Sequence, residues 1–261
     1  MTTTTTAGTT GTATTPATTA ATTPVTTPTT TTGRAHPRSA TLRARLGATV
    51  YDPFLARGER LGLERRRIAL LAGARGRVLE IGTGTGLNLA HYPADVEELV
   101  LTEPVAPMAD RARARLAASG RAAEVLAAPA EDLPVATASV DTVVSTLVLC
   151  TVRDVESALS EVARVLRPGG RLLFVEHVHA AGTALGRWQT RLAGPWAGCA
   201  GGCRCDRDLL AAITARFEVR TLHRAEWTGM PGIVRPLVVG TATPSRAATH
   251  GAWEHHVTRR T

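Results

Sequence analysis

The sequence predicts an α/β fold in which a mostly parallel, seven-stranded sheet is covered by helices on both faces. Short apolar runs alternate with segments that carry apolar residues at helical spacing, which is typical of such sheets. Two further features fit this fold. A glycine-rich turn follows the first apolar run, and an acidic residue ends the second. Ligands of parallel sheets bind at the carboxyl ends of the strands, so a site is expected there.

The elements follow in order along the chain. Strands are predicted at 77–81, 98–102, 123–127, 140–147 and 171–178, and helices at 85–92, 106–119, 155–166 and from about 207. In the helix 155–166, Leu159, Val162 and Val165 share one face. Arg167-Pro168-Gly169-Gly170 ends that helix, because proline and glycine do not continue it. Residues 217–222 and 234–240 are predicted to form an antiparallel pair at the edge of the sheet.

The two ends of the chain differ from its middle. Residues 1–33 are mostly threonine and carry no charge, so they cannot bury enough apolar surface to offset their ordering entropy. We therefore expect a disordered tail at 1–41, a folded domain at 42–242 and a disordered tail at 243–261. The threonine segment lacks the pattern of a secretory signal, and no apolar run reaches the length of a membrane span. A cytoplasmic location is therefore expected.

Charge and composition limit the function classes. The net charge is +8 and all 30 basic residues are arginine, so a P-loop nucleotidase, which needs a lysine, is excluded. A nucleic-acid-binding protein is an alternative, but aromatic residues make up only 3% of the chain and no basic stripe or reading motif is visible. Nucleic acid is therefore not an expected partner. Contact with an anionic membrane surface stays an alternative, and no feature indicates an oligomeric state.

The glycine-rich turn has the spacing Gly82-x-Gly84-x-Gly86, directly after the first strand. Such spacing permits a tight turn, a ligand lying close over the loop, and close packing of the next segment. Glu103 ends the second strand about 20 residues further on, where a carboxylate can accept hydrogen bonds from both hydroxyls of a ribose. The structural alternative for the glycines is an ordinary strand-to-helix turn. For Glu103 it is a negative charge at the start of the helix that follows Pro104.

These residues resemble a known family. The motifs are V-L-E-I-G-T-G-T-G at 78–86, A-E-D-L-P at 130–134, V-D-T-V-V-S at 140–145 and L-R-P-G-G at 166–170. Together with Glu103 they resemble the class I S-adenosylmethionine-dependent methyltransferases, whose fold is Rossmann-like. Further segments, among them F-V-E-H-V at 174–178 and G-G-C at 201–203, resemble the alkyl thiol methyltransferase group and its bacterial relatives.

The resemblance implies S-adenosyl-L-methionine as the cofactor and a small molecule, with thiols as one known class, as the methyl acceptor. A lipid or quinone acceptor at a membrane surface is the alternative within the same fold. The residues that the family roles assign to the cofactor are Glu80, Gly82, Gly84, Gly86, Asn88, Glu103 and Ala130. Pro129 stands where many of these enzymes have an adenine-binding Asp, so Glu131 or Asp132 is expected to replace it. Tyr51 is a candidate lid residue.

The acceptor side is expected near the ends of the fourth and fifth strands. His177 is the candidate general base, with a structural hydrogen-bond donor as the alternative. Cys150 is the second catalytic candidate, with a small buried apolar residue as the alternative. Cys203 and Arg207 are assigned to an acceptor loop, in which Arg204 and Arg207 would lower thiol pKa values and attract an anionic acceptor.

A metal at the C-x₃-C-x-C cluster is a further alternative. Cys199, Cys203 and Cys205 are close in sequence, but a zinc site usually has four ligands and no second cysteine pair follows. We therefore expect no metal at this cluster.

Overall fold

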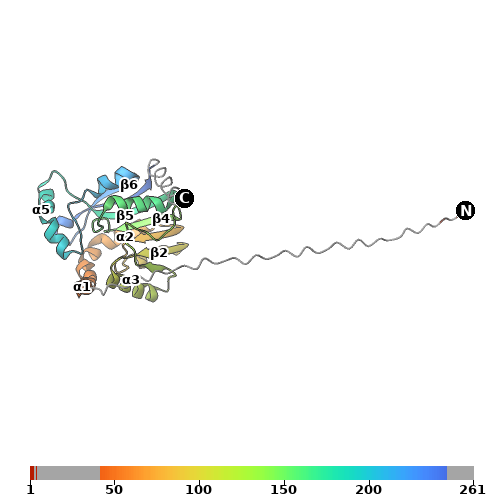
Figure 1. The fold of residues 1–261 in the computed structure, drawn as a ribbon, viewed down its shortest axis with the longest axis horizontal. Helices are drawn as coiled ribbons and strands as arrows, with labels where there is room; N and C mark the ends of the chain where they lie inside the picture. The colour runs from red at the N-terminus through yellow and green to blue at the C-terminus, as the bar shows by residue number, and fades with distance from the viewer. Residues whose placement is uncertain (3, 5–41, 246–261) are drawn as a thin grey trace, which may run out of the picture. The chain divides into compact units, whose positions relative to one another are not determined.

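A computed structural model describes residues 1–2, 4 and 42–245 of the chain, and Figure 1 shows how their elements are arranged. The predictions for the threonine-rich segment and for 246–261 lie outside the described residues. The helices are α1 (Leu42–Gly58), α2 (Glu64–Leu71), α3 (Ala106–Ser119), α4 (Val155–Val165), α5 (Ala184–Cys199) and α6 (Leu209–Arg216). The strands are β1 (Arg77–Ile81), β2 (Glu98–Thr102), β3 (Glu124–Leu126), β4 (Val140–Thr146), β5 (Leu166–His177), β6 (Phe217–Glu226) and β7 (Pro236–Pro244). Short irregular turns lie at η1 (Glu59–Leu63), η2 (Leu89–His91) and η3 (Gly232–Val234).

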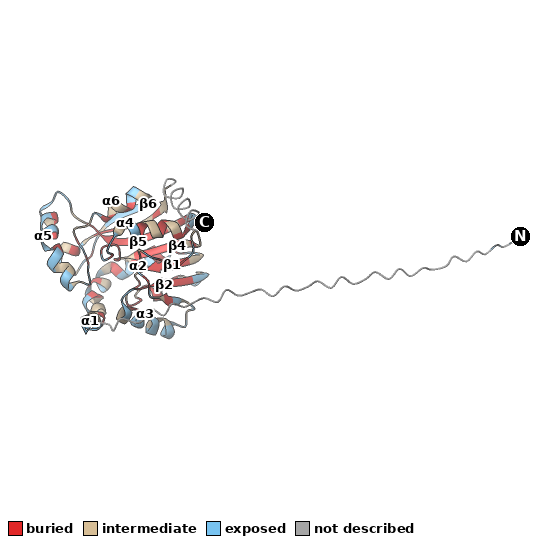
Figure 2. Ribbon diagram, viewed as in Figure 1, coloured by how far each residue is buried: buried red, intermediate tan, exposed pale blue. Residues whose placement is uncertain are grey.

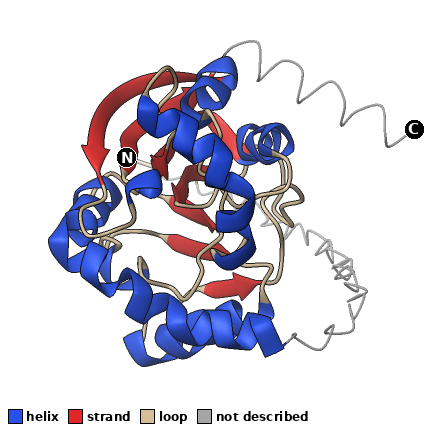
Figure 3. Ribbon diagram, turned by 90° about the vertical axis from the view of Figure 1, so that its left-hand side faces the viewer, coloured by secondary structure: helices blue, strands red, loops and turns tan. Residues whose placement is uncertain are grey.

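The seven strands form one sheet with the order β3-β2-β1-β4-β5-β7-β6. The first five strands pair in parallel, whereas β7 runs antiparallel between β5 and β6. Helices lie on both faces of the sheet, as Figure 3 shows. The predicted fold class is therefore confirmed, including the antiparallel pair at the edge.

The core follows the central strands, which Figure 2 shows as almost wholly buried. Side chains with no exposed surface include Val78, Leu79, Ile81, Val143, Val144, Leu172 and Leu173. Strands that are buried on both faces read as continuous apolar runs, so these segments were recognisable in the sequence. Helix α4 covers part of this core with its apolar face, and Asp154 caps it by accepting a hydrogen bond from the Glu156 backbone N–H at 3.1 Å.

One predicted helix is wrong. Residues 85–92 form turns and the short η2 instead of a regular helix. Gly86 has a φ of +85°, which a right-handed helix does not allow, and Pro93 follows soon after. Too few residues remain between them for a stable helix. The segment is held by side-chain contacts of Asn88 rather than by a helical backbone.

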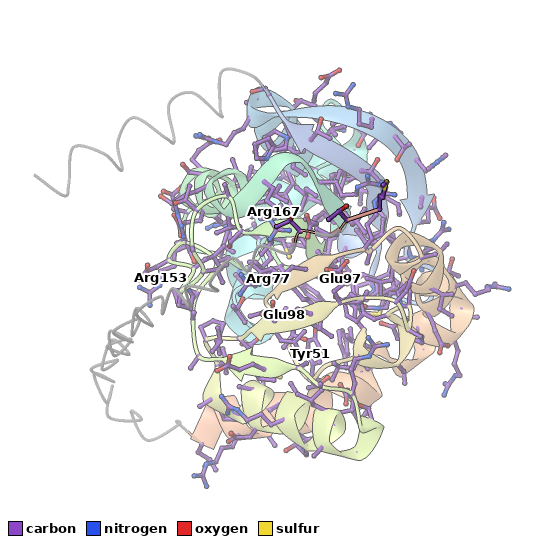
Figure 4. All side chains as sticks on the ribbon, turned by 90° about the vertical axis from the view of Figure 1, so that its right-hand side faces the viewer. Tyr51, Arg77, Glu97, Glu98, Arg153 and Arg167 are labelled. Carbon is purple, nitrogen blue, oxygen red and sulfur yellow. The ribbon has the colours of Figure 1, made fainter. Side chains whose placement is uncertain are left out.

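Several strand boundaries also differ, most of all in β5, β6 and β7, and β6 continues to Glu226 where the prediction ended at 222. Strand β7 begins at Pro236 and reaches Pro244, because Val234 belongs to η3, whereas the prediction was 234–240. Strand β5 begins at Leu166, which pairs with Val140 of β4, so the strand starts where α4 ends. At the opposite end of the sheet from the predicted site, Arg77 and Glu98 begin β1 and β2 and form an ion pair at 2.9 Å (both labelled in Figure 4).

No helix in the part of the chain that the structure describes combines the length and the apolar character needed to cross a membrane. Helix α1 does expose apolar side chains at a spacing of four residues, namely those of Leu42, Leu46, Val50 and Phe54.

Candidate active site

The glycine-rich loop leaves the carboxyl end of β1 and turns back along the sheet. The Thr83 backbone N–H donates to the Thr102 carbonyl of β2 at 2.9 Å, so the loop is tied to the neighbouring strand. Gly82 has a φ of +55°, and a Cβ there would lie 2.6 Å from a methyl carbon of Val148. Only glycine fits this position. At Gly84, with a φ of +60°, an added Cβ would meet only a ring carbon of Tyr51, at 3.8 Å. A Cβ at Gly84 would therefore be in ordinary van der Waals contact with the Tyr51 ring, which covers the loop.

Glu103 closes this loop from the end of β2. Its carboxylate accepts hydrogen bonds from the backbone N–H of Gly84 and of Val105, each at 2.9 Å. Burial raises the pKa of the Glu103 carboxyl, and these two hydrogen bonds oppose the rise. The contact with Val105 fits the structural alternative at the start of α3, and the contact with Gly84 joins the carboxylate to the loop. An ionised carboxylate offers about four lone-pair positions, so two remain for hydroxyl groups of a ligand.

A buried polar network lies under the loop. The Glu80 carboxylate accepts hydrogen bonds from Tyr92 Oη at 2.6 Å and from Asn88 Nδ2 at 3.1 Å. Asn88 Oδ1 in turn accepts from the Arg67 guanidinium at 3.0 Å, and Arg67 pairs with Glu59 at 3.0 Å. Burial raises the pKa of the Glu80 carboxyl, against the lowering effect of Tyr92. Two predicted cofactor residues, Glu80 and Asn88, are thus brought together.

Arg67 and Glu59 were missed by the sequence analysis. They lie on α2 and η1, outside the motifs that carry the resemblance, and no local pattern distinguishes Arg67 from Arg65 and Arg66. Only the structure distinguishes these three arginines, because Arg67 is 5% exposed whereas Arg65 and Arg66 are more exposed.

Tyr51 lies on α1 and reaches the loop from outside the sheet. Its pKa is raised to about 12, mainly by burial; Arg67 lowers it, and the negative charges of Glu103 and Glu59 raise it further. The neighbouring Asp52 fixes α1 in place, since it accepts a hydrogen bond from Thr85 Oγ1 at 2.6 Å and pairs with Arg115 at 2.8 Å. The position of Tyr51 over Gly84 fits a lid, and the contribution of Asp52 was not foreseen.

Ala130 and Glu131 follow β3. Ala130 is buried, with 5% exposure. The Glu131 carboxylate accepts hydrogen bonds from the backbone N–H of Arg153 at 2.6 Å and of Asp154 at 3.3 Å. It therefore holds the turn before α4. Both bonds use the same carboxylate oxygen, and the adenine contact that we expected of Glu131 stays a prediction.

Three predicted residues meet at the ends of β4 and β5. One ligating atom from each of Cys150, His177 and Cys203 lies within 4.8 Å of the other two, and all three residues are buried. Cys203 Sγ lies 3.2 Å from His177 Nε2 and accepts a hydrogen bond from Trp196 Nε1 at 3.2 Å.

The thiols of this cluster differ in pKa. The Cys203 pKa is lowered, first by a hydrogen bond with Cys150 and then, against burial, by His177 and Trp196. The Cys150 pKa is raised well above its usual range, by Cys203 and by burial. Negative charge is therefore favoured on Cys203, and Cys150 stays protonated beside it.

Arg207 binds the protein's own backbone. Its guanidinium donates to the carbonyls of Leu149 at 2.9 Å, Cys150 at 3.2 Å and Val152 at 2.7 Å, and to that of Arg153 at 3.4 Å. These bonds hold the turn after β4, which is a structural role that we did not predict, and a contact with an anionic acceptor stays a prediction. Arg204 is likewise paired, with Asp206 at 3.1 Å.

The other two cysteines of the C-x₃-C-x-C segment do not join the cluster. Cys199 is exposed near the end of α5, and its Sγ donates to the Trp196 carbonyl. Cys205 is buried, and its pKa is raised to about 11, chiefly by burial. Arg204 lowers the Cys205 pKa, as predicted, but burial and the negative charges of Cys203 and Asp206 outweigh that effect.

Glu176 was not among the predicted site residues. It is fully buried on β5, and one carboxylate oxygen accepts hydrogen bonds from Ser145 Oγ at 2.7 Å, Val148 N at 3.1 Å and Leu149 N at 3.2 Å. Glu176 and Arg207 therefore fix the β4 turn from two sides.

The chain resembles known proteins in sequence. Residues 79–174 match the family model of a methyltransferase domain. The chain is similar to human thiol S-methyltransferase TMT1A, with 36% identity over 179 residues, which cover 66% of this chain and 72% of that protein. It is also similar to human thiol S-methyltransferase TMT1B, with 38% identity over 145 residues, which cover 53% of this chain and 59% of that protein.

A likeness to solved structures supports the fold. One, from Thermotoga maritima, is described as a SAM-dependent methyltransferase and possible histamine N-methyltransferase. The two structures superpose with a TM-score of 0.57 and 22% sequence identity. The alignment covers 78% of this chain and 98% of the Thermotoga maritima chain.

Proposed function

The chain belongs to the class I S-adenosylmethionine-dependent methyltransferases, together with the human thiol S-methyltransferases, and from this premise we propose that its methyl acceptor is a small thiol. The observation that carries the proposal is the 36% identity with a thiol S-methyltransferase over 72% of that protein's length. The geometry adds a buried cluster of two thiols and an imidazole where the acceptor side of the fold is expected.

The residues of the loop fit the cofactor. Glu103 is aimed at Gly84 with unused acceptor positions, and the space above Gly84 is bounded by Tyr51. In our proposal Glu103 accepts hydrogen bonds from the ribose hydroxyls, while Gly82, Gly84 and Gly86 let the cofactor approach the backbone. When bound, S-adenosylmethionine supplies a methyl group on a sulfonium sulfur, so attack by the acceptor's sulfur forms one carbon–sulfur bond and breaks another while the acceptor's proton passes to solvent.

Glu80 and Asn88 hold the floor of this site. Their hydrogen bonds with each other and with Arg67 keep the loop in one conformation, and the buried Glu80 carboxylate can attract a positively charged ligand group. The buried Ala130, near the end of β3, is proposed to offer its backbone N–H to the adenine ring.

The protein's remaining tasks are alignment and exclusion of water. A thiol with an ordinary pKa of about 8.5 is partly ionised near neutral pH, so a strong general base is not required. The turn after β4, fixed by Glu176 and Arg207, places Cys150 next to His177 and Cys203 in a buried setting. We propose that the acceptor sulfur binds beside these three residues, between them and Tyr51.

A turnover assay separates the acceptor classes. The full-length chain is incubated with S-adenosylmethionine and, in parallel, with small alkyl thiols, a demethylated quinone, and phosphatidylethanolamine vesicles. Formation of S-adenosylhomocysteine and of the methylated product is followed by mass spectrometry. We expect turnover with thiols. Turnover with the quinone or the lipid and with no thiol would contradict the proposal and leave methyl transfer itself intact.

The lid is tested in the same assay with Tyr51→Ala and Tyr51→Phe. We expect Tyr51→Ala to raise the KM for S-adenosylmethionine. Tyr51→Phe keeps the ring over Gly84, so its KM should stay close to that of the unchanged protein. Equal KM values in all three proteins would show that the ring does not cover the cofactor.

A further inference from the structure

We propose that Cys150, His177 and Cys203 form a binding site for a divalent cation of the zinc type, with one coordination position left open. Each residue comes from a different part of the fold: the turn after β4, the end of β5, and the loop between α5 and α6. The fold therefore brings together two sulfur ligands and one nitrogen ligand. His177 is 27 residues from Cys150 and 26 residues from Cys203 in the sequence, so the short spacings of the usual zinc motifs would not reveal the site.

The distances suit such a site. Zinc–sulfur bonds of about 2.3 Å and zinc–nitrogen bonds of about 2.0–2.1 Å place the ligand atoms of a tetrahedron about 3.5–3.8 Å apart. Cys203 Sγ and His177 Nε2 are 3.2 Å apart, and no two of the three ligand atoms are more than 4.8 Å apart. Shifts of a few tenths of an ångström to about 1 Å would bring them to ideal separations. Rotation of buried side chains can supply shifts of this size.

The imidazole has no competing protein partner. His177 is 3% exposed, and its Nδ1 atom makes no hydrogen bond to any described residue. Its Nε2 atom makes one hydrogen-bond contact with a described residue, at 3.2 Å to the sulfur of Cys203. A histidine that served only as a structural donor would direct an N–H at an oxygen, so this arrangement favours a ligand over the structural alternative.

Charge and softness select the cation. Two thiolates neutralise a divalent ion, which removes the cost of burying an isolated charge among apolar neighbours. Thiolate and imidazole ligands favour zinc and its relatives over magnesium and calcium, which prefer oxygen. Trp196 Nε1, which donates to Cys203 Sγ at 3.2 Å, supplies the kind of outer hydrogen bond that orients a metal ligand.

Three protein ligands leave one tetrahedral position for an exchangeable ligand, as in catalytic zinc sites with two cysteines and one histidine. This part of the inference rests on the proposed function: the exchangeable ligand would be the acceptor thiol, bound through its sulfur after its proton has passed to solvent. Coordination keeps a thiol ionised at a pH where most of it would otherwise be protonated. His177 is then a ligand and not a general base.

Cobalt provides the test, because Co²⁺ substitutes for zinc and absorbs strongly in the near ultraviolet when thiolates bind it. The full-length, reduced chain is titrated with Co²⁺ and then with Zn²⁺. We expect one Co²⁺ per chain, a thiolate-to-cobalt band, and loss of the band as Zn²⁺ displaces the cobalt. A reduced chain that shows no band would overturn the proposal.

Matched cysteine variants locate the ligands. Cys150→Ser, Cys203→Ser and His177→Gln should each weaken Co²⁺ binding at least tenfold, whereas Cys199→Ser and Cys205→Ser should leave it unchanged. Thermal unfolding and far-ultraviolet circular dichroism of each variant identify any that fails to fold, and the other ligand variants then carry the test. A band that persists in the Cys150→Ser/Cys203→Ser double variant, or that requires Cys199 or Cys205, would overturn the assignment.

Failure of the metal site and failure of the thiol acceptor give different results. A cobalt band of the expected kind without turnover of any thiol leaves the metal site standing and refutes the acceptor. Turnover of thiols at an unchanged rate by chelator-treated protein, with no cobalt band in the titration, refutes the metal site and leaves the acceptor standing.

Discussion

The Glu103 carboxylate accepts a hydrogen bond of 2.9 Å from the backbone N–H of Gly84, although the two residues belong to different strand–loop junctions. This bond joins the acidic residue at the end of β2 to the middle of the glycine-rich loop. In our proposal the cofactor's ribose lies over Gly84, so this bond would partly assemble the binding surface before the cofactor arrives. Preorganisation of this kind lowers the cost of ordering the site on binding.

Replacement of Glu103 is expected to weaken S-adenosylmethionine binding. Glu103→Ala removes the acceptor of hydrogen bonds from the ribose, and bonds to a charged group contribute about 1.5–3 kcal/mol each. The dissociation constant measured by isothermal titration should rise at least about tenfold. Glu97→Ala is the matched control, because Glu97 is an exposed carboxylate just before β2 (labelled in Figure 4). Equal affinities of Glu103→Ala and the control would refute the assigned role.

The glycines of the loop should separate stability from binding. In Gly82→Ala the new Cβ would lie 2.6 Å from Val148, so overpacking of about 1–3 kcal/mol adds to the cost of the left-handed backbone. In Gly84→Ala only the backbone cost of about 1–2 kcal/mol applies, but the methyl group enters the space between the loop and Tyr51.

Chemical denaturation and titration with S-adenosylmethionine measure the two effects. We expect Gly82→Ala to lose more stability than Gly84→Ala, and Gly84→Ala to lose cofactor affinity while it remains folded. Full affinity in folded Gly84→Ala would show that the cofactor does not pass over this residue.

The buried Glu80 carboxyl should make stability depend on pH. Its pKa is raised in the folded state, mainly by burial, so the folded protein binds the proton more tightly than the unfolded chain. The contribution is therefore fully present below the ordinary pKa of 4.5 and is lost as pH rises through the higher folded-state value. Glu80→Gln removes this titration and keeps one oxygen as an acceptor.

Urea unfolding of both proteins at a series of pH values above about 4.5 tests this sign. The stability of the unchanged protein relative to Glu80→Gln should fall as pH rises, and then level off once the folded-state carboxyl has ionised. A difference that is constant with pH, or that grows as pH rises, would show that burial does not dominate the titration of Glu80.

Most of the sheet could be predicted because its strands are buried on both faces. Residues 77–81 and 98–102 were predicted with the boundaries that β1 and β2 have in the structure, since continuous apolar runs bounded by charges and turns leave little ambiguity. Helices α1, α2 and α5 were not predicted. In α1 the apolar residues that share one face, Leu46, Val50 and Phe54, are exposed and do not pack on the core.

The site was predictable where one motif carries one role, and not where a role depends on distant partners. Gly84 and Glu103 were each assigned to the cofactor from their motifs, and the structure joins them by a hydrogen bond. Arg67 could not be distinguished from its neighbours. The bonds of Arg207 to backbone carbonyls were not foreseen either, because its partners come from the turn after β4, more than 50 residues away. Cys150, His177 and Cys203 were each named as candidates, but their meeting at one point depends on the docking of the loop between α5 and α6.

Arg207 provides the last test, because its two interpretations predict different kinetics. As a structural residue, its guanidinium holds the carbonyls of Leu149, Cys150 and Val152. Arg207→Ala and Arg207→Lys should then both lose stability, since a lysine ammonium lacks the planar fork that spans several carbonyls. A single hydrogen bond from a charged donor contributes about 1.5–3 kcal/mol, so a loss of that order is expected from denaturation.

Turnover of the Arg207 variants should fall by the same factor for neutral and anionic thiols, because the turn that carries Cys150 loosens whatever the acceptor's charge. Arg204→Ala, which removes an exposed arginine paired with Asp206, is the control for general loss of positive charge. If Arg207 attracted the acceptor directly, Arg207→Lys would retain most activity and Arg207→Ala would raise the KM of anionic thiols alone. That pattern would restore the role in substrate binding, because a contact limited to backbone carbonyls does not distinguish one acceptor charge from another.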